Sequence, residues 1–440
     1  MNPDVTAGIL AGIQMLGELD APDLALFFWF TLIFELPRYL VGGLVFLYRS
    51  VRNVLFGVPE QPLPVPNRNF SVIIAGHNEA ESLPVCVHSI LEQTAMGDPR
   101  TGQKRLGEIV VVDDGSIDET RNVIQRLIKA GAIDIGLSIE MRGGKSAATN
   151  LAIAHCSHDF IIIVDADTTF DRDAFQHLLA HFDDPAVGAV GGNLFVRNPG
   201  ASLTTVYQDI EYRISISLGR RISEMLDLLG IVSGAFGAFR RSAVEEVGGF
   251  DVEVGEDADI TMKLRSAGWH LVFEPMARAG TDVPATVSAL VRQRLRWDRS
   301  IVTIWWRKYD HLLNPFHASF SLANAAVIFD VVILQILISG AFFVYLVWIV
   351  LTFGWFTIVL LSATLFVYLC LSLVSLLISG IVDGRRDTVM LVVFLPWFVL
   401  FGCFGMRLVR LYAAVDELVF RRSYRDPYVP RRVMQQVERI

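Results

Sequence analysis

The sequence predicts an α/β domain with a mostly parallel sheet, joined to helices that cross a membrane. Between residues 70 and 285, short β-branched apolar runs alternate with helical patterns, as in βαβ units. Long apolar segments lie on both sides of this region, and the chain is 52% hydrophobic with a mean hydropathy of +0.45. We therefore assign the long segments to a bilayer.

Four regions follow one another along the chain. The first contains an apolar run at 21–48, long enough to span a bilayer, and the basic residues after it indicate that its end faces the cytosol. The second is the cytosolic α/β domain, entered through a proline-rich linker at 57–69. The third comprises amphipathic interface helices, and the fourth holds two to three spans and a basic cytosolic tail. These regions are 1–56, 57–285, 286–318 and 319–440.

The α/β domain opens with four predicted strands and four predicted helices. The strands are Phe70–Ala75, Glu108–Val112, Ile135–Ile139 and Phe160–Val164. The helices lie near 81–94, 118–130, 144–156 and 171–182. Ligands bind beyond the carboxyl ends of the strands in such sheets, and polar clusters follow the strands there. We expect a ligand site at this edge.

Charge and cysteine content exclude two classes of function. The net charge of −8 argues against nucleic-acid binding, which needs a basic surface. The four cysteines are widely spaced, which indicates reduced, packed thiols and neither a disulfide framework nor a zinc site. They are Cys86, Cys156, Cys370 and Cys403.

Basic residues alternate with tryptophans and aliphatic residues across 286–318, which favours a helix at the membrane interface over one packed on the domain. Apolar segments follow at 320–350, 353–381 and 389–412, each long enough to span. Three simple spans would place the arginine-rich tail outside, against the positive-inside rule. The last segment, which contains Pro396, is therefore bent or re-entrant, or the count of spans is wrong.

Two acidic clusters follow strands. Asp113-Asp114-Gly115-Ser116 is consistent with a contact to a ribose, a base or a metal, and equally with a turn and helix cap. In Asp165-Ala166-Asp167, alternate residues of an extended chain point the same way, so both carboxylates can face one cation. Oxygen ligands suit Mg²⁺ or Mn²⁺, with Asp167 as the direct ligand.

Three further clusters carry anion-binding or acid–base chemistry. Gly143-Gly144-Lys145 opens a helix and suits a diphosphate. Asn78-Glu79 faces a base or caps a helix. Glu256-Asp257 offers a general base or, equally, a helix cap. On the basic helix, Gln293, Arg296 and Trp297 share a face, where Arg296 can clamp a diphosphate and Trp297 can stack on a sugar.

The clusters together resemble family-2 inverting glycosyltransferases, and most closely the processive membrane synthases of cellulose, hyaluronan, chitin and poly-N-acetylglucosamine. The resemblance covers roughly residues 70–310. It is carried, in order, by Asn78-Glu79, Asp113-Asp114-Gly115-Ser116, Gly144-Lys145, Asp165-Ala166-Asp167, Glu256-Asp257 and Gln293-x-x-Arg296-Trp297.

The resemblance implies a GT-A fold, with the site residues in defined roles. The nucleotide sugar is bound by Asn78, Glu79, Asp113, Asp114, Lys145, Asp165, Gln293 and Arg296. Asp165 and Asp167 hold Mg²⁺ or Mn²⁺, and Asp257 is the catalytic base. The acceptor meets Ser233, Gly234, Glu256 and Trp297. Two residues depart from the family pattern: His77, where an aromatic or small residue is more usual, and Gly255, where cellulose and poly-N-acetylglucosamine synthases often have threonine. The second argues against those branches.

We expect a multi-pass enzyme of the bacterial inner membrane that polymerises UDP-glucose or UDP-N-acetylglucosamine at the cytosolic face and secretes the growing polysaccharide, with possible accessory export subunits. Polar residues in the spans are candidates for a sugar-facing channel, namely Asn324, Asp330 and Gln335. For Asn324 and Asp330, a position at the membrane interface is an equal alternative. The alternatives are a non-processive enzyme that adds one sugar to a lipid carrier, a non-catalytic sensor and a transporter. Intact acidic motifs argue against the sensor, and the large soluble domain argues against the transporter.

Overall fold

A computed structural model of the chain describes residues 20–36, 68–97, 106–317 and 320–425, together with the isolated residues 14, 17, 18, 42–44, 48 and 52. Most of the predicted linker, the second half of the first apolar run and the basic residues Arg431 and Arg432 lie outside the described residues. The chain divides into two compact units: residues 60–328 with 413–440, and residues 1–59 with 329–412. We call them the catalytic unit and the apolar unit and describe each separately.

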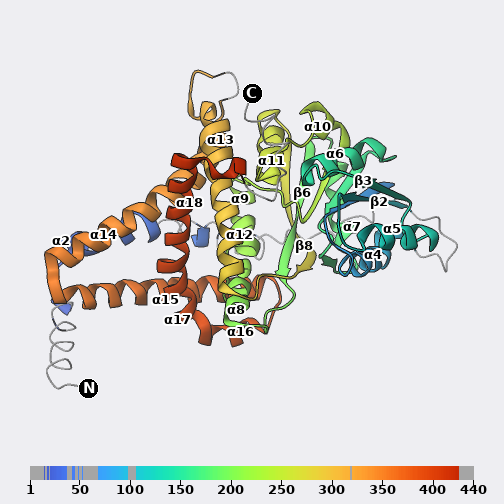
Figure 1. Cartoon of the computed structure of the whole chain (residues 1–440). Helices are drawn as coiled ribbons and strands as arrows, with labels where there is room; N and C mark the ends of the chain where they lie inside the picture. The colour runs from blue at the N-terminus through green and yellow to red at the C-terminus, as the bar shows by residue number, and fades with distance from the viewer. Residues whose placement is uncertain are drawn as a thin grey trace. The chain divides into compact units, whose positions relative to one another are not determined.

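The catalytic unit is built on one eight-stranded sheet (Figure 1). Its strands are β1 Phe70–Gly76, β2 Gly107–Asp114, β3 Ile135–Ile139, β4 Phe160–Val164, β5 Thr169–Phe170, β6 Val187–Val196, β7 Phe236–Arg240 and β8 His270–Thr281. Their order is β3-β2-β1-β4-β7-β6-β8-β5. The four predicted strands are confirmed and form the parallel half. In the other half β7 runs antiparallel to both β4 and β6, β8 is parallel to β6, and β5 is antiparallel to β8.

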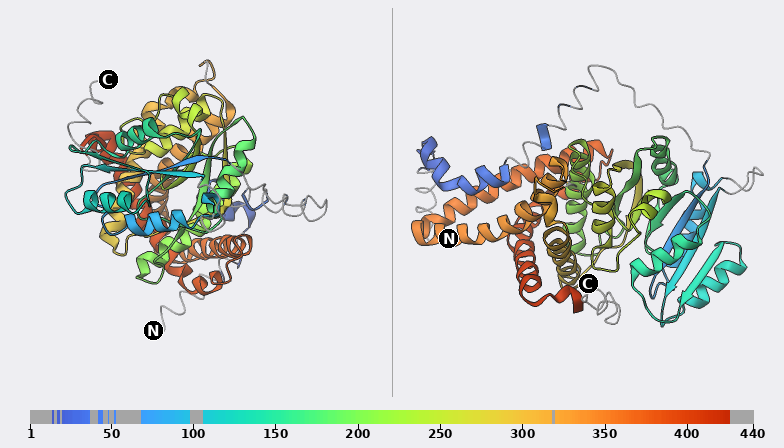
Figure 2. Two further views of the ribbon diagram at one scale, coloured as in Figure 1. Left: turned by 90° about the vertical axis from the view of Figure 1, so that its right-hand side faces the viewer. Right: turned by 90° about the horizontal axis from the view of Figure 1, so that it is seen from above.

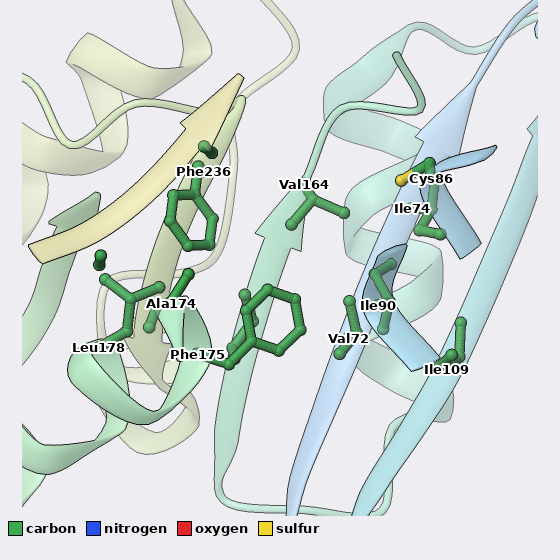
Figure 3. Close-up of a cluster of buried hydrophobic side chains, with 14 of the residues drawn as sticks. Val72, Ile74, Cys86, Ile90, Ile109, Val164, Ala174, Phe175, Leu178 and Phe236 are labelled. Carbon is green, nitrogen blue, oxygen red and sulfur yellow. The ribbon is translucent and has the colours of Figure 1, made fainter. Parts of the chain in front are cut away.

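Helices cover both faces of the sheet (Figure 2). The four predicted helices are confirmed as α4 Leu83–Leu91, α5 Thr120–Lys129, α6 Lys145–His155 and α7 Ala174–Ala180. Successive residues of a strand point to opposite faces, so Val72 and Ile74 join one core with α4, α5 and α7 (Figure 3), while Ile73 joins a second core with α6. Burial on both faces explains why these strands are continuously apolar. Cys86 and Cys156 are packed in the two cores, as predicted. Cys403 is half-buried, whereas Cys370 is exposed, so the prediction of a packed thiol is wrong for Cys370.

The second half of the unit adds further helices. They are α8 Leu203–Glu211, the π-helix η5 Tyr212–Leu218, α9 Gly219–Met225, α10 Arg241–Glu246, α11 Glu256–Ser266, α12 Val287–Ser300, the π-helix η6 Ile301–Lys308, the 3₁₀ helix η7 Asp310–Leu313 and α13 Leu322–Ile328. Short 3₁₀ turns, η2 Thr94–Met96 and η4 His181–Asp183, complete the unit's earlier part. The sequence did not indicate β6, β7 or β8.

Ion pairs join the α12–η6 segment to the C-terminal end of helix α18 Arg407–Phe420. Arg299 lies 2.8 Å from Asp416, and Arg307 lies 2.6 Å from Glu417. Both acids are buried, and Glu417 also accepts hydrogen bonds from Ser423. Buried pairs of this kind hold their elements in one register, because separating them leaves an uncompensated charge.

The prediction that 286–318 lies at the membrane interface needs one correction. Trp305 is 1% exposed, so it is a core residue of the catalytic unit, whereas the adjacent Trp306 is 47% exposed. Arg299 and Arg307 bind acids of the protein. The alternative interpretation, a helix packed on the domain, therefore holds for the buried side, and interface binding remains a prediction for the side that carries Trp306.

Within the described residues, the apolar unit contains two helical runs long and apolar enough to cross a membrane: Leu322–Val382, whose first turns belong to the catalytic unit, and Thr388–Phe420. The first run reverses at Gly354, which has φ +53°, so α14 Ile338–Phe353 and α15 Thr357–Val382 are two arms of a hairpin (Figure 1). All three predicted apolar segments are thus helical. The remaining elements are α2 Ala21–Phe30, η1 Thr31–Glu35, η8 Phe329–Leu337, η9 Gly354–Phe356, α16 Thr388–Leu391, η10 Val392–Phe394, α17 Leu395–Leu400, η11 Phe401–Met406 and η12 Arg422–Arg425.

Helix α2 packs on α14 in this unit, where Phe30 stacks on Tyr345 at 5.4 Å and the Tyr345 hydroxyl donates to the carbonyl of Phe27. One candidate for the sugar channel is corrected: Asn324 lies in the catalytic unit, 5% exposed, and accepts a hydrogen bond from Arg265, so its role is to pack that unit. Asp330 and Gln335 lie in the apolar unit and stay predictions.

Candidate active site

The polar clusters meet at one edge of the sheet because of strand register. Gly76 of β1 pairs with Asp113 of β2, so both strands end at the same level. Strand β4 is parallel to β1 and ends one residue before Asp165. Strand β7 runs the opposite way, and its first residue pairs with the last residue of β4. The loop that precedes β7, which contains Ser233 and Gly234, therefore lies at the same edge.

The Asp113-Asp114 pair holds neighbouring loops in place. The two carboxylate oxygens of Asp114 accept hydrogen bonds from the backbone N–H groups of Gly143 (2.6 Å) and Gly144 (2.8 Å). Asp113 accepts from Ser116 through Oδ1, so the turn alternative is realised, while its buried Oδ2 has no hydrogen-bond partner among the described residues. Asp114 thus orients the glycine loop, while Asp113 Oδ2 lies 3.8 Å from the guanidinium of Arg121.

Asn78 links the first two strand ends. It has φ +62°, which asparagine tolerates better than most residues. Its N–H donates to the Ser116 hydroxyl, and its side-chain oxygen accepts from the N–H of Ile117. His77 adds a 2.9 Å contact between its ring Nδ1 and the carbonyl of Asp114. The alternative that Asn78 caps α4 is wrong, since Ser82 is the cap residue, and its contact with a base stays a prediction.

Lys145 connects four elements. Its Nζ lies 2.5 Å from Asp165 after β4, donates to the carbonyl of Gly234 at 3.3 Å, and lies 3.7 Å from Glu256 at the start of α11. Lys145 itself begins α6. A side chain on Gly234 would place its Cβ 3.2 Å from Lys145 Nζ and 3.6 Å from Asp257, so a larger residue would crowd the lysine. These contacts bring together residues that lie about a hundred positions apart in the sequence.

Negative charge exceeds positive charge around Lys145. Burial, and then the charge of Asp165, raise the pKa of Asp167. Burial also raises the pKa of Glu79, with further contributions from Asp167 and Asp165. Carboxylates held this close disfavour ionisation unless a cation joins them. The donors are hard oxygens, so Asp165 and Asp167 fit Mg²⁺ or Mn²⁺.

A second acidic group lies outside this site and is already neutralised by lysine. Asp251, Glu253 and Asp259 are close enough to share a cation. The ammonium of Lys308 lies 2.5–2.7 Å from an oxygen of each. It thus occupies the position that a metal would take. Lys263 adds a second cation at 2.6 Å from Asp251.

This cluster of acids and lysines predicts that stability depends on pH. Burial, and then the charge of Asp259, raise the pKa of Glu253 from its ordinary value to about 7. When Glu253 is protonated, the charges of Asp251 and Asp259 are balanced by those of Lys263 and Lys308. A carboxyl group whose pKa is raised by folding stabilises the fold in its protonated form. This contribution to the free energy of unfolding is complete below pH about 4.5 and is lost as the pH rises through about 7. It amounts to roughly 3 kcal/mol.

We expect Glu253→Gln to remove that loss. The melting temperature of the purified wild type should fall relative to Glu253→Gln between pH 5 and 8. The exposed Glu140→Gln serves as the control and should follow the wild type. Parallel curves for all three proteins would show that Glu253 does not titrate in this range.

Glu256 and Asp257 begin α11 immediately after Gly255, which has φ +93°. The cap residue of α11 is Gly255, so the alternative that Asp257 caps the helix is wrong. Asp257 Oδ1 accepts from the N–H of Ala258 inside the first turn. Burial raises the pKa of Glu256, against the effect of nearby Lys145. The role of Asp257 as the base stays a prediction.

Helix α12 meets this loop closely. A Cβ on Gly255 would lie 2.7 Å from the Cβ of Ser300, which explains glycine at that position. Gln293 and Arg296 are half-buried, and the side-chain oxygen of Gln293 is buried without a hydrogen-bond partner among the described residues. Trp297 is 37% exposed.

Two charged residues near the site had not been predicted. Arg294 forms an ion pair with Glu211 at 2.5 Å. Arg220 has a buried Nη1 with no hydrogen-bond partner in the described part of the chain, and burial lowers its pKa against the opposing charge of Asp257. The position of Arg294 directly after Gln293 could have indicated its role. Nothing in the sequence around Arg220 indicated that it lies near the site.

Two family models match the chain. The model of glycosyl transferase family 2 matches residues 71–248, and that of glycosyl transferase family group 2 matches residues 160–404. The second match covers more than half of the 440 residues and extends into the apolar unit.

Curated relatives and a solved structure agree with these matches. The poly-β-1,6-N-acetyl-D-glucosamine synthases of Staphylococcus aureus and Staphylococcus epidermidis are 30% identical over 275 residues, which is 62% of this chain but only 64% of each synthase. The mannosyltransferase PcManGT from Pyrobaculum calidifontis, in complex with GDP-Man and Mn²⁺, is 18% identical with a TM-score of 0.55, over 87% of this chain and 99% of that one. The GT-A fold is confirmed. The expectation that Gly255 argues against the poly-N-acetylglucosamine branch is wrong, because the synthases of that branch are the relatives found.

Proposed function

The chain belongs to glycosyl transferase family group 2, and on that premise we propose that it is an inverting membrane glycosyltransferase that polymerises N-acetylglucosamine from a UDP-linked donor. The observation that carries this proposal is the convergence on Lys145 of Asp165, Gly234 and Glu256. It joins proposed donor-binding and acceptor-binding residues in one cluster, directly beside the proposed base Asp257, which follows Glu256 in α11. Of the two donors considered, the names of the curated relatives favour UDP-N-acetylglucosamine.

The reaction uses Asp257 as its base. Oδ2 of Asp257 removes a proton from the acceptor hydroxyl, and the resulting oxygen attacks the anomeric carbon from the side opposite the nucleotide. The bond between that carbon and the diphosphate breaks as the new glycosidic bond forms, which inverts the configuration. Lys145 and Arg296 stabilise the charge that the diphosphate gains on leaving. Mg²⁺ or Mn²⁺ held by Asp165 and Asp167 supplies further positive charge there when bound.

The remaining proposed residues bind the two substrates. Asp113 Oδ2 accepts from the nucleoside, with Asn78, Glu79 and Asp114 shaping the loops around it. Gln293 covers the diphosphate. The indole of Trp297 stacks on the acceptor sugar, beside Ser233 and Gly234. A sugar that stays stacked after each transfer is placed for the next one, which makes the enzyme processive.

The membrane assignment rests on the two long apolar helical runs. We propose that they lie in the bacterial inner membrane with the catalytic unit in the cytosol, where sugar nucleotides are made. The polymer then leaves through the apolar unit, with or without accessory export subunits. Asp330 and Gln335 are the polar side chains that we place along its path.

A panel of sugar nucleotides tests the proposal. Purified full-length protein in lipid nanodiscs with Mn²⁺ or Mg²⁺ should release UDP from UDP-N-acetylglucosamine faster than from UDP-glucose, GDP-mannose or UDP-galactose. The product should be a long polymer cut by hydrolases specific for β-linked N-acetylglucosamine. A single sugar added to a lipid would instead establish the non-processive alternative. No release of nucleotide from any donor would refute a transferase.

A further inference from the structure

One residue of α12 contacts Trp297 from within the same helix. Arg294 lies three positions before Trp297, and residues at that spacing are neighbours on a helix surface. The central carbon of the Arg294 guanidinium lies 4.4 Å from the centroid of the Trp297 ring. That distance is within the ~6 Å reach of a cation–π contact. The guanidinium thus covers one face of the indole.

The guanidinium is itself fixed by a second helix. Arg294 Nη2 lies 2.5 Å from an oxygen of Glu211, with 14% and 21% of the two side chains exposed. Burial lowers the pKa of Arg294, but Glu211, Tyr212, Tyr207 and Asp298 together raise it above its ordinary value. Glu211 ends α8, directly before the π-helix η5, and π-helical turns occur frequently at functional sites.

The geometry leaves one face of the indole for a ligand. Trp297 is 37% exposed although Arg294 lies against its ring. A planar guanidinium held by a carboxylate restricts both the position and the tilt of the indole ring. A tryptophan without such a neighbour on a helix surface is not restricted in this way. An aromatic surface that is already oriented binds a sugar at a lower cost in conformational entropy.

We propose that Arg294, held by Glu211, is a positioning residue that fixes the Trp297 indole as a flat surface for the acceptor sugar. The inference rests on the proposed function, because it assigns the acceptor to Trp297. Arg294 lies behind the ring and touches no substrate. Its loss should weaken binding of the acceptor and leave binding of the donor unchanged.

The test compares Arg294→Met with Arg292→Met in nanodiscs. Arg292 lies on the same helix, is exposed and serves as the matched control. For Arg294→Met we expect the KM for an added N-acetylglucosamine oligosaccharide to rise about tenfold, equivalent to about 1.4 kcal/mol. The products should shorten, while the KM for the donor and the affinity for UDP stay at wild-type values. Arg292→Met should match the wild type in all four measurements.

Three further variants separate positioning from a general loss of structure. Arg294→Lys keeps a cation but loses the fork that binds Glu211, so its acceptor KM should fall between wild type and Arg294→Met. Glu211→Gln should resemble Arg294→Met. In a Trp297→Ala background, adding Arg294→Met should change nothing further, because the ring to be positioned is gone.

Two results would overturn the inference. One is an acceptor KM for Arg294→Met and Arg294→Lys equal to that of Arg292→Met. The other is a donor KM that rises as much as the acceptor KM. If Arg294→Met does not fold, Arg294→Lys and Glu211→Gln decide the question. Failure of the proposed function is distinct, since the wild type itself would then release no UDP.

Discussion

Asp257→Asn is expected to lower turnover by about 10²–10⁴-fold, the range for loss of a positioned general base. Asparagine has the size of aspartate and can still accept the hydrogen bond from Ala258 that begins α11. It cannot remove the proton from an acceptor hydroxyl. The fold, the affinity for UDP and the KM for the donor should therefore stay close to those of the wild type.

The measurement is single-turnover release of UDP, with UDP affinity determined separately by calorimetry. Asp159→Asn is the matched control, since Asp159 is exposed and immediately precedes β4, at the opposite edge of the sheet from the site. It should have wild-type turnover. Polymer formed by Asp257→Asn at more than a tenth of the wild-type rate would assign the base to another residue.

Asp167→Asn is expected to abolish metal-dependent activity, with a loss of about 10²-fold or more because charge on the leaving diphosphate is no longer neutralised. Its stability should change in the opposite direction. Burial and the charge of Asp165 raise the pKa of Asp167, so its ionised form destabilises the metal-free fold at neutral pH. Removing the charge should raise the melting temperature by a few degrees.

Metal titration distinguishes this result from a simple loss of structure. Adding Mn²⁺ should raise the melting temperature of the wild type and of Asp159→Asn, because a ligand that binds only the folded state stabilises it. Mn²⁺ should leave Asp167→Asn unchanged. An equal rise in all three proteins would place the metal elsewhere.

Strands β1, β2 and β4 of the parallel half could be predicted because each contains a continuous apolar run buried on both faces, whereas β3 at the edge of the sheet is only half-buried. Strand β6 carries no such signal, since Gly188, Gly191 and Gly192 interrupt its pattern. Position 192 requires glycine because the ring of Phe236 of β7 lies against it, and a Cβ there would approach that ring to 2.1 Å. A contact between residues this far apart in the chain leaves a glycine in the sequence but does not name its partner.

The acidic motifs were found because their residue types suit metal and acid–base chemistry, but their individual contacts were not. Asp113 and Asp114 end the same strand, yet Asp114 accepts hydrogen bonds from the loop of Gly143, whereas Asp113 accepts one from Ser116 in its own turn and lies 3.8 Å from Arg121. That division depends on where the 143–144 loop passes, which local sequence does not encode.

The prediction from a 3.6-residue helical repeat was wrong for the two tryptophans that follow α12. The segment Ile301–Lys308 is a π-helix, with a hydrogen-bond spacing longer than that of an α-helix. Side chains therefore drift around the axis relative to a 3.6-residue repeat. Trp305 turns into the core and Trp306 remains outside. Sequence patterns that assume an α-helix cannot separate the two.

The ion pairs at Asp416 and Glu417 have a consequence for biosynthesis. Arg299 and Arg307 are translated 117 and 110 residues before their buried counter-charges. At about 5–20 residues per second, the ribosome needs roughly 5–20 s to deliver those acids. During that interval the helix that carries Gln293 and Trp297 lacks its final anchor. A nascent chain thus completes this part of its fold only after α18 has been synthesised.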